Sequence, residues 1–272
     1  MKLNDRVIVV TGSTRGIGRA IAEACAKEGA RVVICSRQKS AVRETLHTFK
    51  KEGWQVSGIT IDVSVGEDLE KLLQYAIETW GRIDVWINNA GLSGGFRPLQ
   101  EMSQEEIRAL VDVNLTAVLD ACRIVIPYFI TQGAGILINM SGKGGRGEPS
   151  PFLATYSATK AAITNLTKSL AQENRTYPIS IHSVIPGMVA TDFYKDMKTS
   201  PELAASTQSL PYVLKAFGVP TDIVGRFFVK IAAQEPGKAT GKTYSILSGW
   251  RLVRAISLMI WYRAAGKIKK MV

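Results

Sequence analysis

The sequence predicts an α/β fold, a single-domain doubly wound parallel sheet with helices on both faces, because two kinds of segment alternate along it. With 272 residues, 46% of them hydrophobic, the chain is long enough for one such domain with a sizeable core. Short apolar runs rich in valine and isoleucine are typical of buried strands and occupy residues 7–10, 32–35, 56–61, 83–87, 136–139, 179–185 and 243–247. Segments with helical periodicity lie between them, at residues 17–28, 40–52, 67–80, 103–130, 155–175 and 221–233.

Two segments interrupt this alternation. One is the glycine-rich stretch from Ser141 to Gly147, and the other is the longer stretch from Met188 to Gly218. Both follow a predicted strand directly, at the edge where ligands of open α/β sheets bind. We therefore expect the functional site there, with the longer stretch closing over the substrate.

The domain is expected to span residues 1–250, and residues 251–272 form a basic helical extension of it. This extension contains six basic side chains and no acidic one, mixed with apolar residues. It is too short and too charged to span a bilayer. Three alternatives remain: a helix that covers its own domain, a contact with another subunit, or a peripheral membrane contact.

Composition argues against several other classes of protein. The formal net charge of +11 comes partly from the extension, and no nucleic-acid motif accompanies it. Cys25, Cys35 and Cys122 show neither a disulfide framework nor metal-ligand spacing, so we expect core thiols and no metal. His47 and His182 are expected on a helix surface and at a strand end. No signal segment precedes the first strand, which predicts a cytoplasmic location.

A glycine-rich turn follows the first predicted strand and leads into a helix. Small residues at such a turn let backbone amides and the helix N-terminus approach a pyrophosphate. The spacing Gly-x-x-x-Gly-x-Gly differs from the commoner dinucleotide fingerprint, and a tight turn without a ligand is the alternative. The predicted cofactor-binding residues of this loop are Gly12, Ser13, Thr14, Arg15, Gly16, Ile17 and Gly18.

The end of the second predicted strand favours NADP over NAD. Ser36 and Arg37 stand where a carboxylate would hold the ribose 2′-hydroxyl of NAD. Together with Arg15, Arg37 offers planar cationic donors suited to a 2′-phosphate. Asp62 and Val63, at the end of the third strand, are expected to meet the adenine, although they also suit an ordinary strand-ending turn.

Tyr156 and Lys160 lie at positions i and i+4 of a predicted helix, so their side chains point to one side. A phenol titrates near ~10, and a neighbouring ammonium lowers that pKa toward neutral pH. Such a phenol can donate or accept a substrate proton. By spacing alone, an ordinary surface pair is the alternative.

Several motifs in one order resemble the short-chain dehydrogenase/reductase family. The resemblance covers roughly residues 5–248 and implies a Rossmann-type fold, a nicotinamide cofactor and a homodimer or homotetramer formed through the two long central helices. The motifs are Thr11 to Gly18, Asn88-Asn89-Ala90-Gly91, Asn114, Tyr156-x-x-x-Lys160 and Pro186-Gly187.

The resemblance implies roles for individual residues. Tyr156 is then the general acid/base, Lys160 holds the nicotinamide ribose and lowers the phenol pKa, and Asn114 anchors the water of a proton relay. By position alone, Asn114 is a polar kink in a long helix, and Thr191 with Asp192 is a helix cap. The further cofactor contacts that the resemblance implies are Asn89, Ala90, Gly91, Tyr156, Lys160, Pro186, Gly187, Val189 and Thr191.

One position departs from the family pattern. Members usually end the fifth strand with Asn-x-Ser-Ser, and the second serine orients the substrate carbonyl. Here Gly142 falls in that slot and Ser141 lies one residue earlier. Because successive strand side chains alternate faces, Ser141 serves as this catalytic residue only if the backbone bends locally. Otherwise a backbone amide of the glycine-rich loop, Ser150 or a water polarises the carbonyl.

This departure has a parallel in one branch of the family. Asn-Met-x-Gly-x-Gly, a Pro-x-Pro before the tyrosine, Tyr-x-Ala-Thr-Lys and Leu-Thr-Lys-Ser-Leu resemble the chlorophyll b reductase branch. Without a plastid transit segment, the chain resembles a bacterial relative. The resemblance implies an NADP(H)-dependent oxidoreductase that reduces a bulky, apolar aldehyde or ketone, or carries out the reverse oxidation. A catalytically impaired NADP-binding regulatory or scaffold protein is the alternative.

Overall fold

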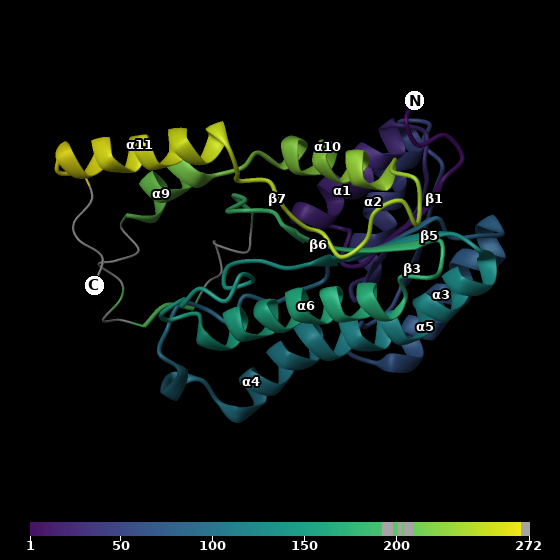
Figure 1. The fold of residues 1–272 in the computed structure, drawn as a ribbon, viewed down its shortest axis with the longest axis horizontal. Coiled ribbons are helices and arrows are strands. Elements are labelled where there is room, and N and C mark those ends of the chain that lie inside the picture. Colours follow the sequence, from purple (N-terminus) through teal and green to yellow (C-terminus); the bar gives the residue numbers. More distant parts are fainter. Residues whose placement is uncertain (192–197, 201–202, 204–208, 268–272) are drawn as a thin grey trace.

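The structure is a computed structural model that describes residues 1–191, 198–200, 203 and 209–267. At its centre lies a seven-stranded parallel sheet in the order β3-β2-β1-β4-β5-β6-β7 (Figure 1). The chain runs outward in one direction from β1 to β3 and in the other from β4 to β7, so the order switches between β1 and β4. The strands are β1 (Val7–Val10), β2 (Arg31–Ser36), β3 (Val56–Thr60), β4 (Val85–Asn88), β5 (Gly135–Met140), β6 (Ile179–Ile185) and β7 (Thr243–Ser245).

Helices cover both faces of this sheet. In Figure 1, α1, α2 and α10 lie on one face, and α3, α5 and α6 lie on the other. The prediction of an α/β doubly wound parallel sheet is therefore confirmed. The helices are α1 (Gly16–Lys27), α2 (Lys39–Lys51), α3 (Gly66–Trp80), η1 (Leu99–Glu101), α4 (Gln104–Val111), η2 (Asp112–Thr116), α5 (Ala117–Gln132), α6 (Ala154–Glu173), α9 (Leu210–Phe217), α10 (Thr221–Ala232) and α11 (Trp250–Ala264).

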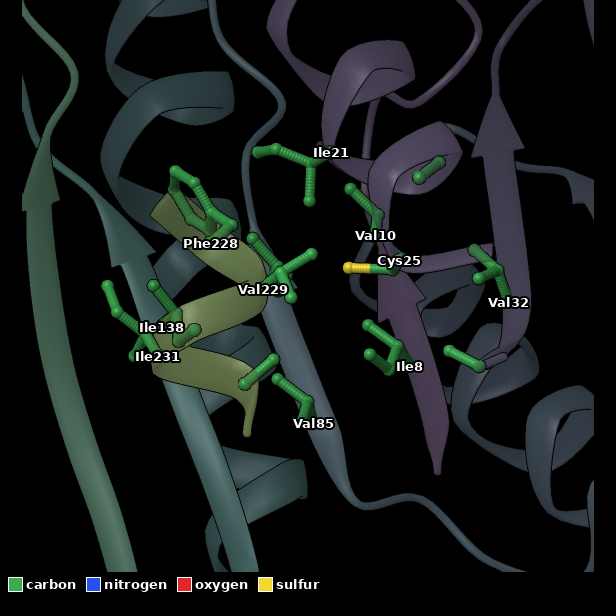
Figure 2. Packing of buried hydrophobic residues seen from close by; sticks show 14 of the residues in the cluster. Ile8, Val10, Ile21, Cys25, Val32, Val85, Ile138, Phe228, Val229 and Ile231 are labelled. Carbon is green, nitrogen blue, oxygen red and sulfur yellow. The ribbon is translucent and has the colours of Figure 1, made fainter. Parts of the chain in front are cut away.

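The apolar strands divide the core into two halves. Ile8 and Val10 of β1 join the cluster beneath α1 and α10, whereas Val9 joins the cluster on the opposite face. Figure 2 shows the first cluster, in which Ile8 and Val10 point toward the helices that carry Cys25 and Phe228. Because side chains alternate along a strand and both faces are covered, every residue of β1 is buried.

Two helical predictions need correction. The single helix expected at residues 103–130 is divided into α4, a π-helical turn η2 and α5. Within the interruption expected between Met188 and Gly218, Leu210–Phe217 form helix α9. The rest of that interruption includes residues 192–197, 201–202 and 204–208, which lie outside the described residues.

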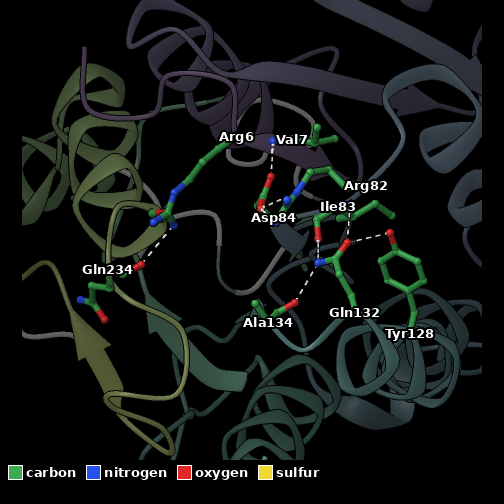
Figure 3. Close-up of polar contacts among 10 residues, drawn as sticks. Arg6, Val7, Arg82, Ile83, Asp84, Tyr128, Gln132, Ala134 and Gln234 are labelled. Carbon is green, nitrogen blue, oxygen red and sulfur yellow. Dashed lines mark hydrogen bonds and ion pairs between the residues drawn. The ribbon is translucent and has the colours of Figure 1, made fainter. Parts of the chain in front are cut away.

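The amino ends of the strands are closed by polar contacts (Figure 3). The Asp84 carboxylate accepts a hydrogen bond from the backbone of Val7 at 2.8 Å and pairs with Arg82 at 2.7 Å. The Gln132 side chain donates to the carbonyls of Ile83 and Ala134, both at 2.8 Å. These polar groups pair with one another at the amino ends. We therefore expect the functional site at the carboxyl ends of the strands, where ligands of open α/β sheets bind.

The cysteines and His182 are core residues. All three thiols are free and buried, and burial raises the pKa of each to about 12, which confirms the predicted core role. The prediction for His182 was wrong, because it lies inside β6 and is fully buried against Tyr244. Burial lowers the pKa of His182 to about 4. His47 is exposed on α2, as predicted.

Candidate active site

The glycine-rich loop forms a cradle between β1 and α1 that side chains would fill. Gly12 and Gly16 have φ angles of +63° and +56°, which non-glycine residues rarely adopt. A Cβ on Gly12 would lie 2.9 Å from the Cα of Ala90, and one on Gly18 would collide with the carbonyl of Gly12. The loop therefore requires glycine at these positions and presents backbone at the N-terminus of α1, which fits a pyrophosphate.

Residues after β4 hold this loop in place. The backbone amides of Asn89 and Ala90 donate to the Thr11 hydroxyl at 2.9 and 3.1 Å. The Asn89 side chain donates to the carbonyls of Thr11 and Gly12 at 2.9 and 3.2 Å. The motifs after β1 and β4 thus form one hydrogen-bonded unit at the switch point of the sheet.

The predicted loop residue Ser13 has a structural role. Its hydroxyl donates to the carbonyl of Val10 at 2.7 Å and accepts from the amide of Cys35 at 3.0 Å. Ser13 is buried and ties the loop to the end of β2. Thr14 is also buried, whereas Arg15 is exposed as the residue before α1.

The residues expected at the adenosine end of a cofactor come together beyond β2 and β3. Arg37 is exposed, and its Nη1 atom lies 3.7 Å from the Asp62 carboxylate. Asp62 also accepts hydrogen bonds from the amide and hydroxyl of Ser64 at 3.0 and 2.7 Å. Asp62 therefore forms a strand-ending turn, the alternative noted from the sequence, and it also places a carboxylate beside Arg37.

The segment after β6 returns to the glycine loop. A Cβ on Gly16 would lie 3.6 Å from two side-chain atoms of Thr191, so Thr191 faces the start of α1. Val189 is buried, and Gly187 has a φ of +80° and faces Val219. Thr191 thus lies beside the cradle. Asp192, its partner in the alternative helix cap, lies outside the described residues.

Asn114 lies in the π-helical turn between α4 and α5 and is fully buried. Its amide donates to the carbonyl of Leu92 at 3.0 Å and accepts from the amide of Leu92 at 2.7 Å. The same side chain donates weakly to Thr159 of α6 at 3.5 Å. A π-turn inside a helix is frequent at functional sites, and here it turns an asparagine toward the segment that follows β4.

Lys160 is buried, and its ammonium donates to the carbonyl of Met140 at 3.0 Å. Burial lowers the pKa of Lys160 to about 8. Among the described residues, no carboxylate pairs with this ammonium. A Cβ on Gly91 would lie 3.3 Å from the Asn114 amide oxygen and 3.9 Å from the Lys160 ammonium. A buried cation without a carboxylate partner fits a site that receives ribose hydroxyls.

Tyr156 lies one helical turn before Lys160, whose ammonium is 5.6 Å from the centre of the phenol ring. A Cβ on Gly142 would lie 2.5 Å from the phenol oxygen and 3.3 Å from the Lys160 side chain. The phenol oxygen therefore faces the backbone of Gly142 at the end of β5. Tyr156, Lys160 and Gly142 form the centre of the candidate site, with Asn114 behind Gly91.

The Ser141 hydroxyl is bonded inside the protein and not at this centre, so its catalytic role stays a prediction. This hydroxyl donates to the carbonyl of Lys160 at 3.0 Å and lies 2.8 Å from the Thr164 hydroxyl. Ser141 is 1% exposed. Ser141 and Gly142 both face α6, but Ser141 lies against Lys160 and Thr164, whereas a Cβ on Gly142 would meet the Tyr156 phenol, so Gly142 takes the slot beside Tyr156.

Glu148 organises the glycine-rich segment, and the sequence did not single it out. Its carboxylate accepts hydrogen bonds from the amides of Gly144 and Arg146, both at 3.0 Å. Gly144 packs against Ser157 of α6 so closely that a side chain there would collide with it. The sequence signal that could have identified Glu148 is a carboxylate that follows a run of glycines, because the amides of such a loop need an acceptor. The hydroxyl of Ser150, another candidate, donates to the Glu148 carbonyl at 3.5 Å.

A small pocket is lined in part by Tyr156. Arg97 also borders this pocket, and its guanidinium pairs with Glu106 at 2.9 Å. The pocket wall is therefore mixed: apolar side chains line much of it, together with the hydroxyls of Ser93, Thr155 and Tyr156 and the paired guanidinium of Arg97. The apolar side chains that line it are Leu99, Met102, Leu110, Phe152 and Leu153.

Comparisons with known proteins identify the family of this chain. Residues 6–202 match the family described as short chain dehydrogenase. The chain is 35% identical over 228 residues to chlorophyll(ide) b reductase NOL, chloroplastic, of Arabidopsis thaliana, which covers 82% of this chain and 64% of the relative. It is 32% identical over 252 residues to 3beta-hydroxysteroid dehydrogenase 1 of Eggerthella lenta, which covers 92% of this chain and 95% of that protein.

The fold is also that of a solved reductase. A variant of actinorhodin polyketide ketoreductase, crystallised with NADPH, superimposes with a TM-score of 0.78 at 28% identity, covering 90% of this chain and 97% of that one. The chain spans just under two thirds of the length of the Arabidopsis relative. Family members use NAD or NADP as cofactor. By its motifs, its fold and these matches, the chain belongs to the short-chain dehydrogenase/reductase family.

Proposed function

We propose that this chain is an NADP(H)-dependent oxidoreductase that reduces a bulky, apolar aldehyde or ketone to an alcohol, or carries out the reverse reaction. The observation that carries this proposal is the contact of the Tyr156 phenol with the backbone of Gly142, one helical turn from the buried ammonium of Lys160. A proton donor, a cation and a backbone without a side chain thus meet at the carboxyl edge of the sheet.

The cofactor is held by the cradle and by the cations around it. Gly12, Gly16 and the N-terminus of α1 receive the pyrophosphate, while Arg15 and Arg37 receive the 2′-phosphate of NADP. The Arg37–Asp62 pair is solvent-exposed, and exposed pairs contribute at most about 1 kcal/mol, so a phosphate can replace Asp62. When bound, the cofactor supplies the hydride, and the chain provides binding, orientation and protons.

In reduction, Tyr156 donates its proton to the carbonyl oxygen. Lys160, with its ammonium beside the phenol ring, holds the nicotinamide ribose and favours the phenolate that remains. Asn114 supports the water that returns the proton, and its bonds to Leu92 keep its amide in position. Since the Ser141 hydroxyl is bonded inside the protein, we assign orientation of the carbonyl to Tyr156 and a backbone amide of the glycine-rich loop.

The apolar side chains in the pocket beside Tyr156 support an apolar substrate. Leu99, Met102 and Phe152 offer no charge to a polar carbonyl compound. Reduction of a formyl group to a hydroxymethyl group, suggested by the similarity to a chlorophyll(ide) b reductase, is the reaction class to test first. Fold similarity alone does not determine a substrate, so steroid and aromatic ketones belong in the same panel.

The test follows NADPH oxidation over a panel of bulky aldehydes and ketones, with Tyr156→Phe as the matched variant. We expect turnover by the wild type, turnover lowered by roughly three orders of magnitude in the variant, and NADPH binding within about twofold of the wild type. Full activity of Tyr156→Phe would remove Tyr156 as the acid/base.

The position of Gly142 favours a second candidate, a dinucleotide-binding regulatory or scaffold protein without catalysis. The usual orienting hydroxyl is missing from the site centre, while the cofactor cradle is complete. NADPH binding without turnover of any panel member, together with unchanged NADPH affinity in Tyr156→Phe, would support this second function.

A further inference from the structure

We propose that α11 docks the protein on the surface of an anionic lipid bilayer. The helix follows β7 and packs against α9, and the two helices stand together at one end of the molecule (Figure 1). Tyr262 of α11 meets Tyr212 of α9 with ring centres 5.2 Å apart. One face of α11 is thus covered by its own chain, in accord with one alternative noted from the sequence.

The opposite face of α11 is exposed and carries large apolar side chains, with Ser257 between them. Ala255 and Tyr262 are buried against the protein, and Val253 and Ile260 each lie two residues before one of them. Two residues correspond to about 200° around a helix, so Val253 and Ile260 point to the other side. Their exposed fractions are 51% and 63%, and Trp250, at the start of the same helix, is 79% exposed.

Basic side chains flank this apolar face. Arg254 lies on one edge and Arg263 on the other, and both are exposed, as is Lys267 just beyond the helix. No acidic residue occurs between residues 236 and 272, and none occurs between residues 203 and 221, which include α9. The pair of helices therefore presents positive charge around an apolar stripe, with no carboxylate on either helix.

This combination favours an anionic membrane over a second copy of the chain. Two α11 faces brought together in a symmetric dimer would place arginines against arginines without acidic partners. A leaflet containing anionic lipids supplies the missing negative charge and takes up the apolar stripe. Tryptophan is enriched where a chain meets the lipid headgroups, and Trp250 and Trp261 are both exposed here.

No helix among the described residues is long and apolar enough to cross a membrane. The 15 residues of α11 would span only about 22 Å, and arginines interrupt them. The helix is expected to lie in the plane of the interface, with its apolar face at the boundary between headgroups and acyl chains.

The experiment is vesicle co-sedimentation of the full chain, with phosphatidylcholine vesicles compared with vesicles that also contain about 30% phosphatidylglycerol. We expect binding to the anionic vesicles, little binding to the neutral ones, and release in about 1 M salt, where the Debye length falls to about 3 Å. The experiment measures binding alone, so its result does not depend on whether the proposed reaction is correct.

The decisive variant is Val253→Ser with Ile260→Ser, which should weaken vesicle binding roughly tenfold or more. Val65→Ser is the matched control: Val65 is 42% exposed, precedes α3, and should leave binding unchanged. Arg254→Gln with Arg263→Gln should weaken binding to anionic vesicles. Equal melting temperatures and circular dichroism would show that the variants fold.

Two results would overturn the proposal. One is the absence of vesicle binding by the wild type, and the other is equal binding of wild type and the Val253→Ser, Ile260→Ser variant. If the wild type does not bind and that variant changes its oligomeric state, the face belongs to a second copy.

Discussion

A Cβ atom on Gly142 would lie 2.5 Å from the phenol oxygen of Tyr156, closer than such atoms approach in folded proteins. Any side chain at position 142 must therefore displace the phenol or the end of β5. Where the family pattern expects an orienting serine, this chain has a glycine, which allows Tyr156, the proposed acid/base residue, to approach the backbone directly.

We expect Gly142→Ala to lower kcat roughly tenfold or more, because a displacement of about 1 Å at a reacting group can cost two orders of magnitude. The affinity for NADPH should stay within about twofold, since the cradle at Gly12 and Gly16 is not touched. Steady-state kinetics on an active panel substrate and calorimetric titration with NADPH measure the two quantities. An unchanged kcat would show that the phenol does not need its observed position.

Ser141→Ala is the matched change one residue earlier. It removes the bonds to the Lys160 carbonyl and the Thr164 hydroxyl inside the protein. We expect a loss of about 1 to 2 kcal/mol in the free energy of unfolding and a kcat within about twofold of the wild type. Urea unfolding and steady-state kinetics report both. A collapse of kcat without loss of stability would restore Ser141 as the carbonyl-orienting residue.

Lys160→Met should increase the free energy of unfolding at neutral pH and abolish turnover. Burial lowers the Lys160 pKa from 10.5 to about 8, so below about pH 8 the folded state holds a charge that burial disfavours. That cost is relieved as pH rises from 8 toward 10.5, where the unfolded chain binds more protons than the folded one. At pH 7 the variant should gain about 2 kcal/mol of unfolding free energy after loss of the Met140 bond, yet lose turnover.

Urea unfolding of wild type and Lys160→Met at neutral pH and near pH 9.5 measures this difference, which should shrink at the higher pH. A variant that is less stable than the wild type by the same amount at both pH values would show that burial of the ammonium carries no such cost.

Arg37→Gln should weaken NADPH binding roughly tenfold or more while leaving NADH binding within about twofold, because only NADPH carries the 2′-phosphate. Arg43→Gln is the control, since Arg43 is an exposed arginine on the neighbouring helix α2. Calorimetric titration of each protein with both cofactors makes the comparison. Equal weakening for both cofactors, or none, would argue against Arg37 as the phosphate ligand.

The sequence allowed the fold to be predicted because its signals are local. Apolar runs such as Val7 to Val10, covered on both faces, mark buried strands, and helical periodicity marks the segments between them. The prediction failed at residues 103–130, because the π-turn around Asn114 depends on bonds to Leu92, 22 residues earlier. His182 was misplaced because its burial depends on Tyr244 of β7.

By itself, then, the sequence determined the order of the strands and of most helices, the glycine loop and the pairing of Tyr156 with Lys160, since each depends on local spacing. Only the tertiary structure decided between Ser141 and Gly142, because both face α6 and the choice depends on which part of that helix each one meets. It also decided which face of α11 is covered. A helical pattern gives the direction of each side chain, but only packing determines what each face meets.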